Sequence, residues 1–187
     1  MIMKYARVIA VFLLFVFNAG GLMAPVPADA AGATELNRDA TRVLKHLYAK
    51  SPSARTLGEK AKGILVFPSI VKGGFIVGGQ RGEGVLRKDG ETVGYYSSVA
   101  LSYGLQAGVQ KFGYALFFMT DSAMKWLDRS DGWELGTGPS IVVADVGTAG
   151  SFTTTTAQSE VYAVFFNQVG LMAGIGLQGT KITKISK

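Results

Sequence analysis

The sequence AKGILVFPSIVKGGFIVGGQRGEGVL, residues 61–86, sets the pattern for most of the chain. It contains two short apolar runs, Ile64–Phe67 and Phe75–Val77, which Pro68-Ser69 and Gly73-Gly74 separate. Apolar runs of about four to eight residues that are bounded by Gly and Pro predict strands joined by turns. Glycine at this density also permits bulges, positive φ angles and the close approach of one strand to another surface. We therefore expect a β structure with an unusual amount of glycine.

The composition limits the class of protein. A chain of 187 residues is long enough for one domain with a real core. Its 25 glycines are nearly twice the usual share of roughly 7%, which favours a β architecture with many tight turns. The net charge of +6 suits an anionic partner such as a membrane surface, but the basic residues form no run, so no nucleic-acid partner is expected. The absence of cysteine excludes disulfides, cysteine-ligated zinc and thiol catalysis.

The first 30 residues have the pattern of a secretory signal peptide. Lys4 and Arg7 precede the apolar run Val8–Phe17, and Ala28-Asp29-Ala30 supplies small residues before an expected cut at Ala31. The alternative is an uncleaved anchor, but an apolar run of about ten to fifteen residues is short beside the roughly 20 of a membrane span. Export without cysteine predicts a bacterial periplasmic protein that is soluble or peripherally associated with a membrane.

The remaining chain, residues 31–187, is expected to form one domain with a helical lead (35–60) and a β body (61–187). Glu35–Ala49 has apolar residues at helical spacing, and Thr34 is its expected N-cap. A second, shorter helix is expected to follow over residues 54–60. In the β body, Asp89-Gly90 predicts a tight hairpin turn. Further strands are expected at 82–86, 92–101, 104–109, 114–119, 133–135, 140–146, 161–167 and 171–179, with a short helix at 121–127 and a polar loop at 150–159.

Several of these strands are apolar on both faces, as in Leu116–Met119, Ile141–Ala144 and Val161–Phe166. An antiparallel sheet with one face in water should alternate apolar and polar residues. The second face of this sheet is therefore expected to be covered by the helix, by another subunit or by an apolar ligand.

The predicted helix 35–49 is basic on its other side, where Arg38, Arg42, Lys45 and His46 lie. A basic amphipathic helix can lie on anionic lipid. The alternative is that its apolar stripe packs on the sheet and its charges are solvated.

No active site is predicted. His46 is the only histidine, and no G-x-S-x-G nucleophile elbow occurs. Asp128–Gly132 lacks the alternating acids and the terminal Glu of a calcium loop and is interpreted as a turn. No Gly-Lys-Ser/Thr follows the glycine repeats, so a phosphate loop is excluded. We expect no catalytic residue, metal or cofactor.

Six segments, in order along the chain, resemble the SYLF-domain family between Leu36 and Ile185. These are Ala61–Ile64, Lys72–Phe75, Gly82–Val85, Tyr96–Val99, Ser102–Gly108 and Val169–Gly179. The family includes exported bacterial proteins and eukaryotic adaptors that bind phosphoinositides and, in yeast, actin filaments. Tyr96 stands where the family usually has Trp and Val99 where it often has Pro, and the loop 147–157 lacks Gly-Arg-Asn-like residues, so a head-group preference does not transfer.

The resemblance implies a mainly β (α+β) fold, a Gly-rich antiparallel sheet that is curved or barrel-like, with N-terminal helices packed on it. It also implies lipid binding without catalysis. The family's lipid contact is attributed to the basic N-terminal segment, which corresponds here to Arg38, Arg42, Lys45, Lys50, Arg55, Lys60 and Lys62. We add Lys72 and Arg81, because they bring charge to the margin of an apolar layer, although both are also explained as solvated turn residues. Actin is not expected as the partner of an exported protein.

Two functions from different classes are therefore considered. The first is a periplasmic module that binds an anionic lipid or membrane surface through the basic helix and the apolar-faced sheet. The second is a structural or interaction protein of the cell envelope, whose apolar face is buried in a homo-oligomer or against a partner. An enzyme is the least favoured class.

Overall fold

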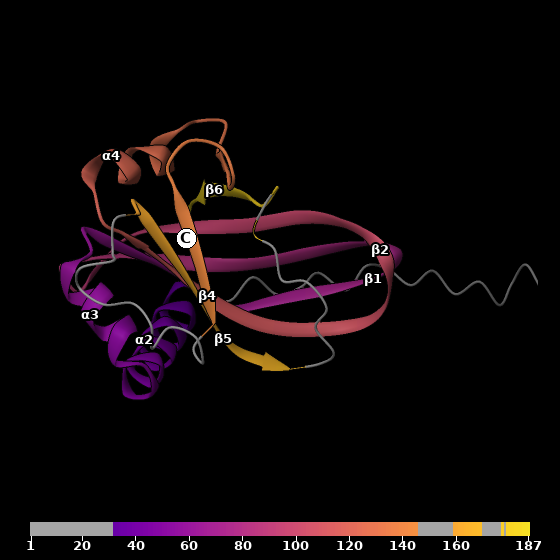
Figure 1. Cartoon of the computed structure of the whole chain (residues 1–187), viewed down its shortest axis with the longest axis horizontal. Coiled ribbons are helices and arrows are strands. Elements are labelled where there is room, and N and C mark those ends of the chain that lie inside the picture. The colour runs from indigo at the N-terminus through magenta and orange to yellow at the C-terminus, as the bar shows by residue number, and fades with distance from the viewer. Residues whose placement is uncertain (1–31, 146–158, 170–176, 178) are drawn as a thin grey trace, which may run out of the picture. The chain divides into compact units, whose positions relative to one another are not determined.

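The computed structural model describes residues 32–145, 159–169, 177 and 179–187, without the side chains of 75–77, 102–108 and 144–145. All of these residues belong to the unit Ala31–Lys187. Two helices, α2 (Ala33–Lys50) and α3 (Pro52–Lys60), lie together against one end of a curled sheet (Figure 1). The sheet contains β1 (Gly63–Lys88), β2 (Glu91–Phe118), β3 (Trp133–Glu134), β4 (Ile141–Asp145), β5 (Val161–Val169) and β6 (Lys181–Ile185), and α4 (Asp121–Met124) and the 3-10 helix η1 (Lys125–Asp128) follow β2.

One long hairpin, β1 with β2, forms the centre of the sheet. The two strands pair antiparallel from Gly63 opposite Phe118 to Lys88 opposite Glu91. Asp89 and Gly90, with φ angles of 52° and 84°, connect them in the left-handed geometry that an Asp-Gly hairpin turn requires. The predicted Asp-Gly turn is confirmed.

The prediction of separate short strands on either side of Pro68-Ser69 and of residues 110–113 is wrong. Pro68 and Ser69 lie within β1, where the pairing shifts between Phe67 and Ile70. β2 likewise continues through residues 110–113. Proline and paired glycines favour turns through their own backbone preferences. Here a partner strand holds the chain extended, so these positions form bulges within the strand.

The remaining strands attach to the two halves of β2. β6 pairs with its first half and β5 with its second half, in the order β3-β6-β2-β5-β4. β4 pairs parallel to β5, so the expectation of a wholly antiparallel sheet is wrong at this edge. Figure 1 shows the β1–β2 hairpin bending round at the end remote from α2 and α3.

The bend brings the second half of β1 onto its first half. A Cβ added at Gly84 would lie 2.7 Å from the carbonyl oxygen of Val66, so only glycine fits. Gly82 has the same relation to Ser69 and Ile70. The close approach expected from the glycine content of this segment is confirmed at these two positions.

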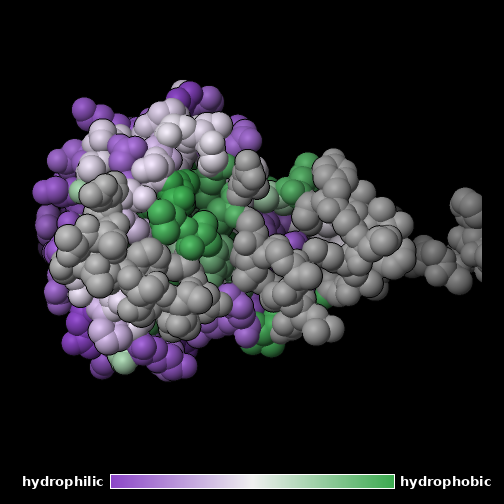
Figure 2. Space-filling view, viewed as in Figure 1, coloured by the Kyte–Doolittle hydropathy of each residue, from purple (hydrophilic) through white to green (hydrophobic). Residues whose placement is uncertain are grey.

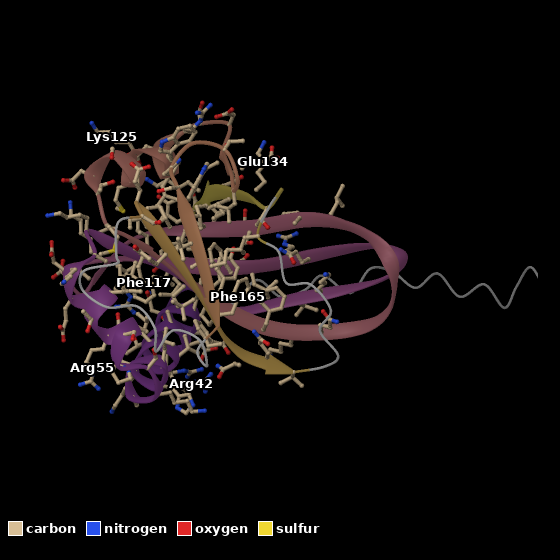
Figure 3. All side chains as sticks on the ribbon, in the orientation of Figure 1. Arg42, Arg55, Phe117, Lys125, Glu134 and Phe165 are labelled. Carbon is tan, nitrogen blue, oxygen red and sulfur yellow. The ribbon has the colours of Figure 1, made fainter. Side chains whose placement is uncertain are left out.

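The sheet is buried on both faces at the end that α2 and α3 cover, as predicted. We call the face covered by α2 and α3 the outer face and the opposite one the inner face. Phe117 packs in the outer cluster with Val66 and the helices, whereas Phe165 packs in the inner cluster (Figure 3). The chain's own helices therefore supply the cover that the sequence required. The fold is mainly β with a helix packed on the sheet, which confirms the predicted class.

The helix ends differ in detail from the predictions. α2 begins at Ala33 after Gly32, so Thr34 is not its N-cap. α3 begins at Pro52 and is capped by the Ser51 hydroxyl, which accepts a hydrogen bond from the Ala54 N–H. The predicted helix at 121–127 is α4 followed by η1, capped by Thr120.

Three predictions fall outside the described residues: the signal peptide at 1–30, most of the loop at 150–159 and most of the strand at 171–179. In the part of the chain that is described, no helix has the length and hydropathy of a membrane span.

Candidate functional site

The apolar stripe of α2 is used for packing, which leaves its basic side outward. Leu36, Val43 and Leu47 are buried in the outer cluster. Arg38 and Arg42 are exposed, and each faces an acid one turn earlier, Arg38 at 3.7 Å from Glu35 and Arg42 at 2.8 Å from Asp39. Exposed pairs of this kind contribute little and exchange readily with other anions. The packing confirms that the stripe lies on the sheet, so any contact of α2 with a ligand uses its charged side.

Asn37 fixes the position of α2 on the hairpin. Its side-chain amide donates to the Tyr95 hydroxyl at 2.8 Å and its side-chain oxygen accepts from Thr92 at 2.6 Å. The Arg87 guanidinium donates to the Asn37 carbonyl at 3.0 Å and to the Thr41 hydroxyl at 2.8 Å. These bonds orient the basic side of the helix relative to the strands.

A groove of about 730 Å³ runs between α2 and the outer face of the sheet. We call it the α2–sheet groove. It is lined by Asp39, Arg42, Val43, Lys45, His46 and Ala49 from α2 and by Pro68, Ser69, Lys111, Phe112, Asn167 and Val169 from the strands. Among the described residues, neither Lys45 nor Lys111 has a carboxylate within ion-pair distance. The groove therefore presents uncommitted positive charge from both of its walls.

Two bulges lie side by side in the floor of this groove. Between Phe67 and Ile70, β1 has one residue more than the facing segment of β2. Between Phe166 and Val169, β5 also has one residue more than β2. Asn167, in the second bulge, is exposed and has a φ of 53°, which is uncommon for a residue other than glycine. Adjacent bulges bend a sheet and free backbone groups from the ladder, and such bulges are frequent next to binding sites.

Exposed aliphatic side chains continue from the groove along the strands. Val71 and Val169 both pair directly with Lys111, so the three residues form a row across β1, β2 and β5. Val109 lies two residues from Lys111 on the same face. The exposed fractions of Val71, Val109 and Val169 are 50%, 75% and 68%. Figure 2 shows apolar surface at this end of β5 and a larger area over β4.

A second groove, of about 740 Å³, lies between α2, α3 and the hairpin turn. Its charged lining is mixed, with Lys45, Arg55 and Arg87 beside Glu59 and Asp89. Tyr48 also lines it. Burial, with a smaller contribution from Glu59, raises the pKa of Tyr48 to about 12. We call this hollow the α2–α3 groove.

The structure brings some of the nine predicted basic residues together and leaves others apart. Arg42 and Lys45 line the α2–sheet groove, and Lys45 and Arg55 line the α2–α3 groove. Both Arg42 and Arg55 lie beside the helices α2 and α3 (Figure 3). The others line neither groove: Arg38, Lys50, Lys60, Lys62 and Arg81 are exposed and Lys72 is half-buried.

Sequence reasoning missed Lys111, Asn167 and Arg87. The sequence predicts Lys111 only as part of the connection between strands 104–109 and 114–119, and the pairing of β2 with β1 and β5 is what places it opposite α2. An Asn after a run of six apolar residues was a signal for a left-handed position at the end of β5, but it does not reveal the neighbouring strand.

The described residues hold no group of three or more His, Asp or Glu side chains that could bind a metal ion. His46 is exposed, as predicted. The Tyr114 hydroxyl is fully buried 2.7 Å from the Ser98 hydroxyl, and burial raises its pKa above the ordinary value. A neutral tyrosine sealed in the core stabilises the inner face and is inaccessible to a substrate. What the site offers chemically is cationic and apolar surface side by side.

Residues 99–187 match the family model described as "Ysc84: Las17-binding protein actin regulator". This match confirms the resemblance to the SYLF-domain family for the part of the chain from the middle of β2 onward. The earlier segments of the resemblance, including residues 61–86, and α2 lie outside the matched range. No curated protein matches the chain.

Proposed function

Because residues 99–187 match the Ysc84, or SYLF, family model, we propose that the chain is a non-enzymatic, exported protein that binds anionic lipid at a membrane surface. The observation that carries this proposal is the outward basic side of α2, with Arg38, Arg42 and Lys45 all exposed over two turns. The family description names Las17 binding and actin regulation for the family, and neither is proposed for an exported chain.

The positive charges on α2 are sufficient for reversible binding to an anionic membrane. A Lys or Arg near an anionic membrane contributes about 1 kcal/mol. Three such residues therefore supply about 3 kcal/mol, and the positive net charge of the protein adds long-range attraction. The apolar stripe of α2 remains on the sheet, so α2 binds from the membrane surface without inserting.

Cosedimentation with vesicles tests the proposal. The triple variant R38E/R42E/K45E is compared with K125E/K181E/K184E, which reverses three exposed charges on η1 and β6 that line neither groove. Both variants change the net charge equally. On phosphatidylglycerol-containing vesicles the first should lose about a hundredfold or more in affinity, and the second should stay near wild type.

An equal loss in both variants would assign binding to net charge alone and would contradict a site on α2. Lipid binding of this kind would be refuted if wild-type protein pelleted equally with neutral phosphatidylcholine vesicles, or if it pelleted with neither kind of vesicle. Circular dichroism of each variant checks that the fold is intact. Export is tested separately, since the mature protein should lack residues 1–30 in its intact mass.

Exposed aliphatic residues on the outer face, among them Leu101 at 72% and Val109 at 75%, favour one second candidate. In that candidate the protein is an interaction module of the cell envelope whose apolar surface is covered by a second copy or by a partner. Light scattering of the delipidated protein decides this for the homo-oligomer: a dimer would support the second candidate, and a monomer that retains vesicle binding would count against it.

A further inference from the structure

We propose that the α2–sheet groove binds the phosphate of a single anionic phospholipid, whose acyl chains lie along the exposed valines beside and beyond Lys111. This inference rests on the proposed lipid binding and deepens it, because it assigns a site for one lipid molecule in which Arg42 and Lys45 of α2 act together with Lys111 of β2.

The charges that line the groove come from two different elements. Arg42 and Lys45 stand on α2, and Lys111 stands on β2 at the opposite wall. The only acid in the described lining is Asp39, which already accepts a hydrogen bond from Arg42 at 2.8 Å. An anion between the walls therefore meets two lysines that have no ion-pair partner among the described residues. Convergent cations of this kind suit a phosphate better than a neutral head group.

The floor adds neutral hydrogen-bond donors at the same level. Ser69 and Asn167 occupy the two adjacent bulges and line the groove, and they offer a hydroxyl and a side-chain amide. A volume of about 730 Å³ lies within the roughly 300–1,000 Å³ typical of small-molecule sites, so a whole head group fits.

The arrangement of charged and apolar side chains along the strands favours a lipid over a free anion. Val71, Lys111 and Val169 stand in one row across three strands, and Val109 follows on the same face. All three valines are at least half exposed. A ligand that places its phosphate at Lys111 therefore meets aliphatic surface immediately beyond it. An amphiphile with a charged head and apolar chains satisfies both parts, whereas inorganic phosphate leaves the valines uncovered.

Titration with a soluble short-chain lipid tests the site on the intact protein. Dihexanoyl phosphatidic acid, dihexanoyl phosphatidylcholine and inorganic phosphate are compared by isothermal titration calorimetry. Wild-type protein should bind the phosphatidic acid, bind the phosphatidylcholine weakly or not at all, and bind inorganic phosphate at least about tenfold more weakly than the phosphatidic acid, since apolar contacts are lost.

Two variants and two matched controls locate the site. Lys111→Gln should weaken phosphatidic acid binding by about fivefold, the value of one cation at a lipid surface, whereas Lys125→Gln should not. Val169→Ser should lower the affinity for phosphatidic acid and leave the affinity for inorganic phosphate unchanged. Val93→Ser, at a valine that is 50% exposed and lines neither groove, should change neither affinity. Equal binding of phosphate and lipid would overturn the apolar part of the site. Unchanged lipid affinity in Lys111→Gln would overturn the whole inference.

The two proposals fail in different ways. If the wild-type protein binds anionic vesicles but no soluble lipid, the groove is not a single-lipid site, and surface binding by α2 stands. If the protein does not bind anionic vesicles, the proposed function itself is wrong. If light scattering shows that the lipid-free protein is a dimer that Val169→Ser dissociates, the valines form a subunit interface and this inference is wrong.

Discussion

Gly84 is the residue at which the bend of the hairpin is most sensitive to a side chain. Its missing Cβ would lie 2.7 Å from the Val66 carbonyl oxygen and 2.6 Å from the Phe67 ring, and both neighbours are fully buried. We expect Gly84→Ala to lower the free energy of unfolding by about 1–3 kcal/mol, the usual cost of overpacking a core. Urea unfolding measures this. Gly79→Ala, whose Cβ meets only the Ala100 carbonyl oxygen at 3.7 Å, is the control in the same strand and should cost much less. Equal effects would mean that close packing does not explain Gly84.

Buried tyrosines give the protein a predictable response to alkaline pH. Burial, and to a smaller extent Asp128, raises the pKa of Tyr96 to about 12, and burial raises the pKa of Tyr114 as well. Below about pH 10 the tyrosines are protonated in both the folded and the unfolded chain and contribute no pH dependence. Above it the unfolded chain loses protons that the folded chain keeps, so the free energy of unfolding falls, by up to about 1.4 kcal/mol per pH unit for each tyrosine.

Urea unfolding of wild type and Tyr96→Phe at pH of about 9, 10 and 11 checks this expectation. The variant should lose less stability than wild type over that interval. Identical slopes in the two proteins would show that Tyr96 keeps its ordinary pKa.

At the scale of elements, Asn37 attaches α2 to the hairpin. The Asn37→Ala variant removes its side-chain bonds to Tyr95 and Thr92, which are part-buried. We expect a loss of about 1–3 kcal/mol in the free energy of unfolding, because the two hydroxyls lose their partner on the helix. Hydrogen exchange should accelerate first in residues 33–50. Thr34→Ala, at an exposed position of the same helix, is the control. Uniformly faster exchange over the whole sheet would contradict a local role.

The elements whose signals are local could be predicted from the sequence. The apolar spacing of residues 36–47 and the Asp89-Gly90 pair each specify their structure through near neighbours, and doubly apolar strands require cover on both faces. The continuity of β1 and β2 could not be predicted in this way, because Pro68-Ser69 forms a turn or a bulge according to the strand beside it. The parallel pairing of β4 with β5 could not be predicted either, because it also depends on which strand lies beside β4 in the folded sheet.

Some residues of the candidate site could be predicted from the sequence and others could not, for the same reason. Arg42 and Lys45 could be found because both stand on one amphipathic helix. Lys111 and Asn167 are 56 positions apart in the chain and meet α2 only through the register of three strands. The register has no signature in a single sequence, and the signal at Asn167 indicates a left-handed position without showing which strand lies beside it.

At the scale of the whole molecule, the α2–sheet groove joins the part of the chain that matches the family model to a part that does not. Lys111, Asn167 and Val169 lie within residues 99–187, whereas Arg42 and Lys45 precede them. Binding that depends on both walls should therefore require the helical lead as well as the matched segment.

The proposed binding depends on attraction between this basic protein and anionic lipid, and the salt dependence of vesicle binding tests that attraction most directly. Vesicles with and without phosphatidylglycerol are titrated with wild-type protein at low and high salt. Exposed charges are screened over about 10 Å at roughly 0.1 M salt and about 3 Å at 1 M, so affinity for the anionic vesicles should fall steeply with salt. Binding to neutral vesicles should be weak at every salt concentration. Affinity that is independent of salt, or equal for neutral and anionic vesicles, would contradict the account.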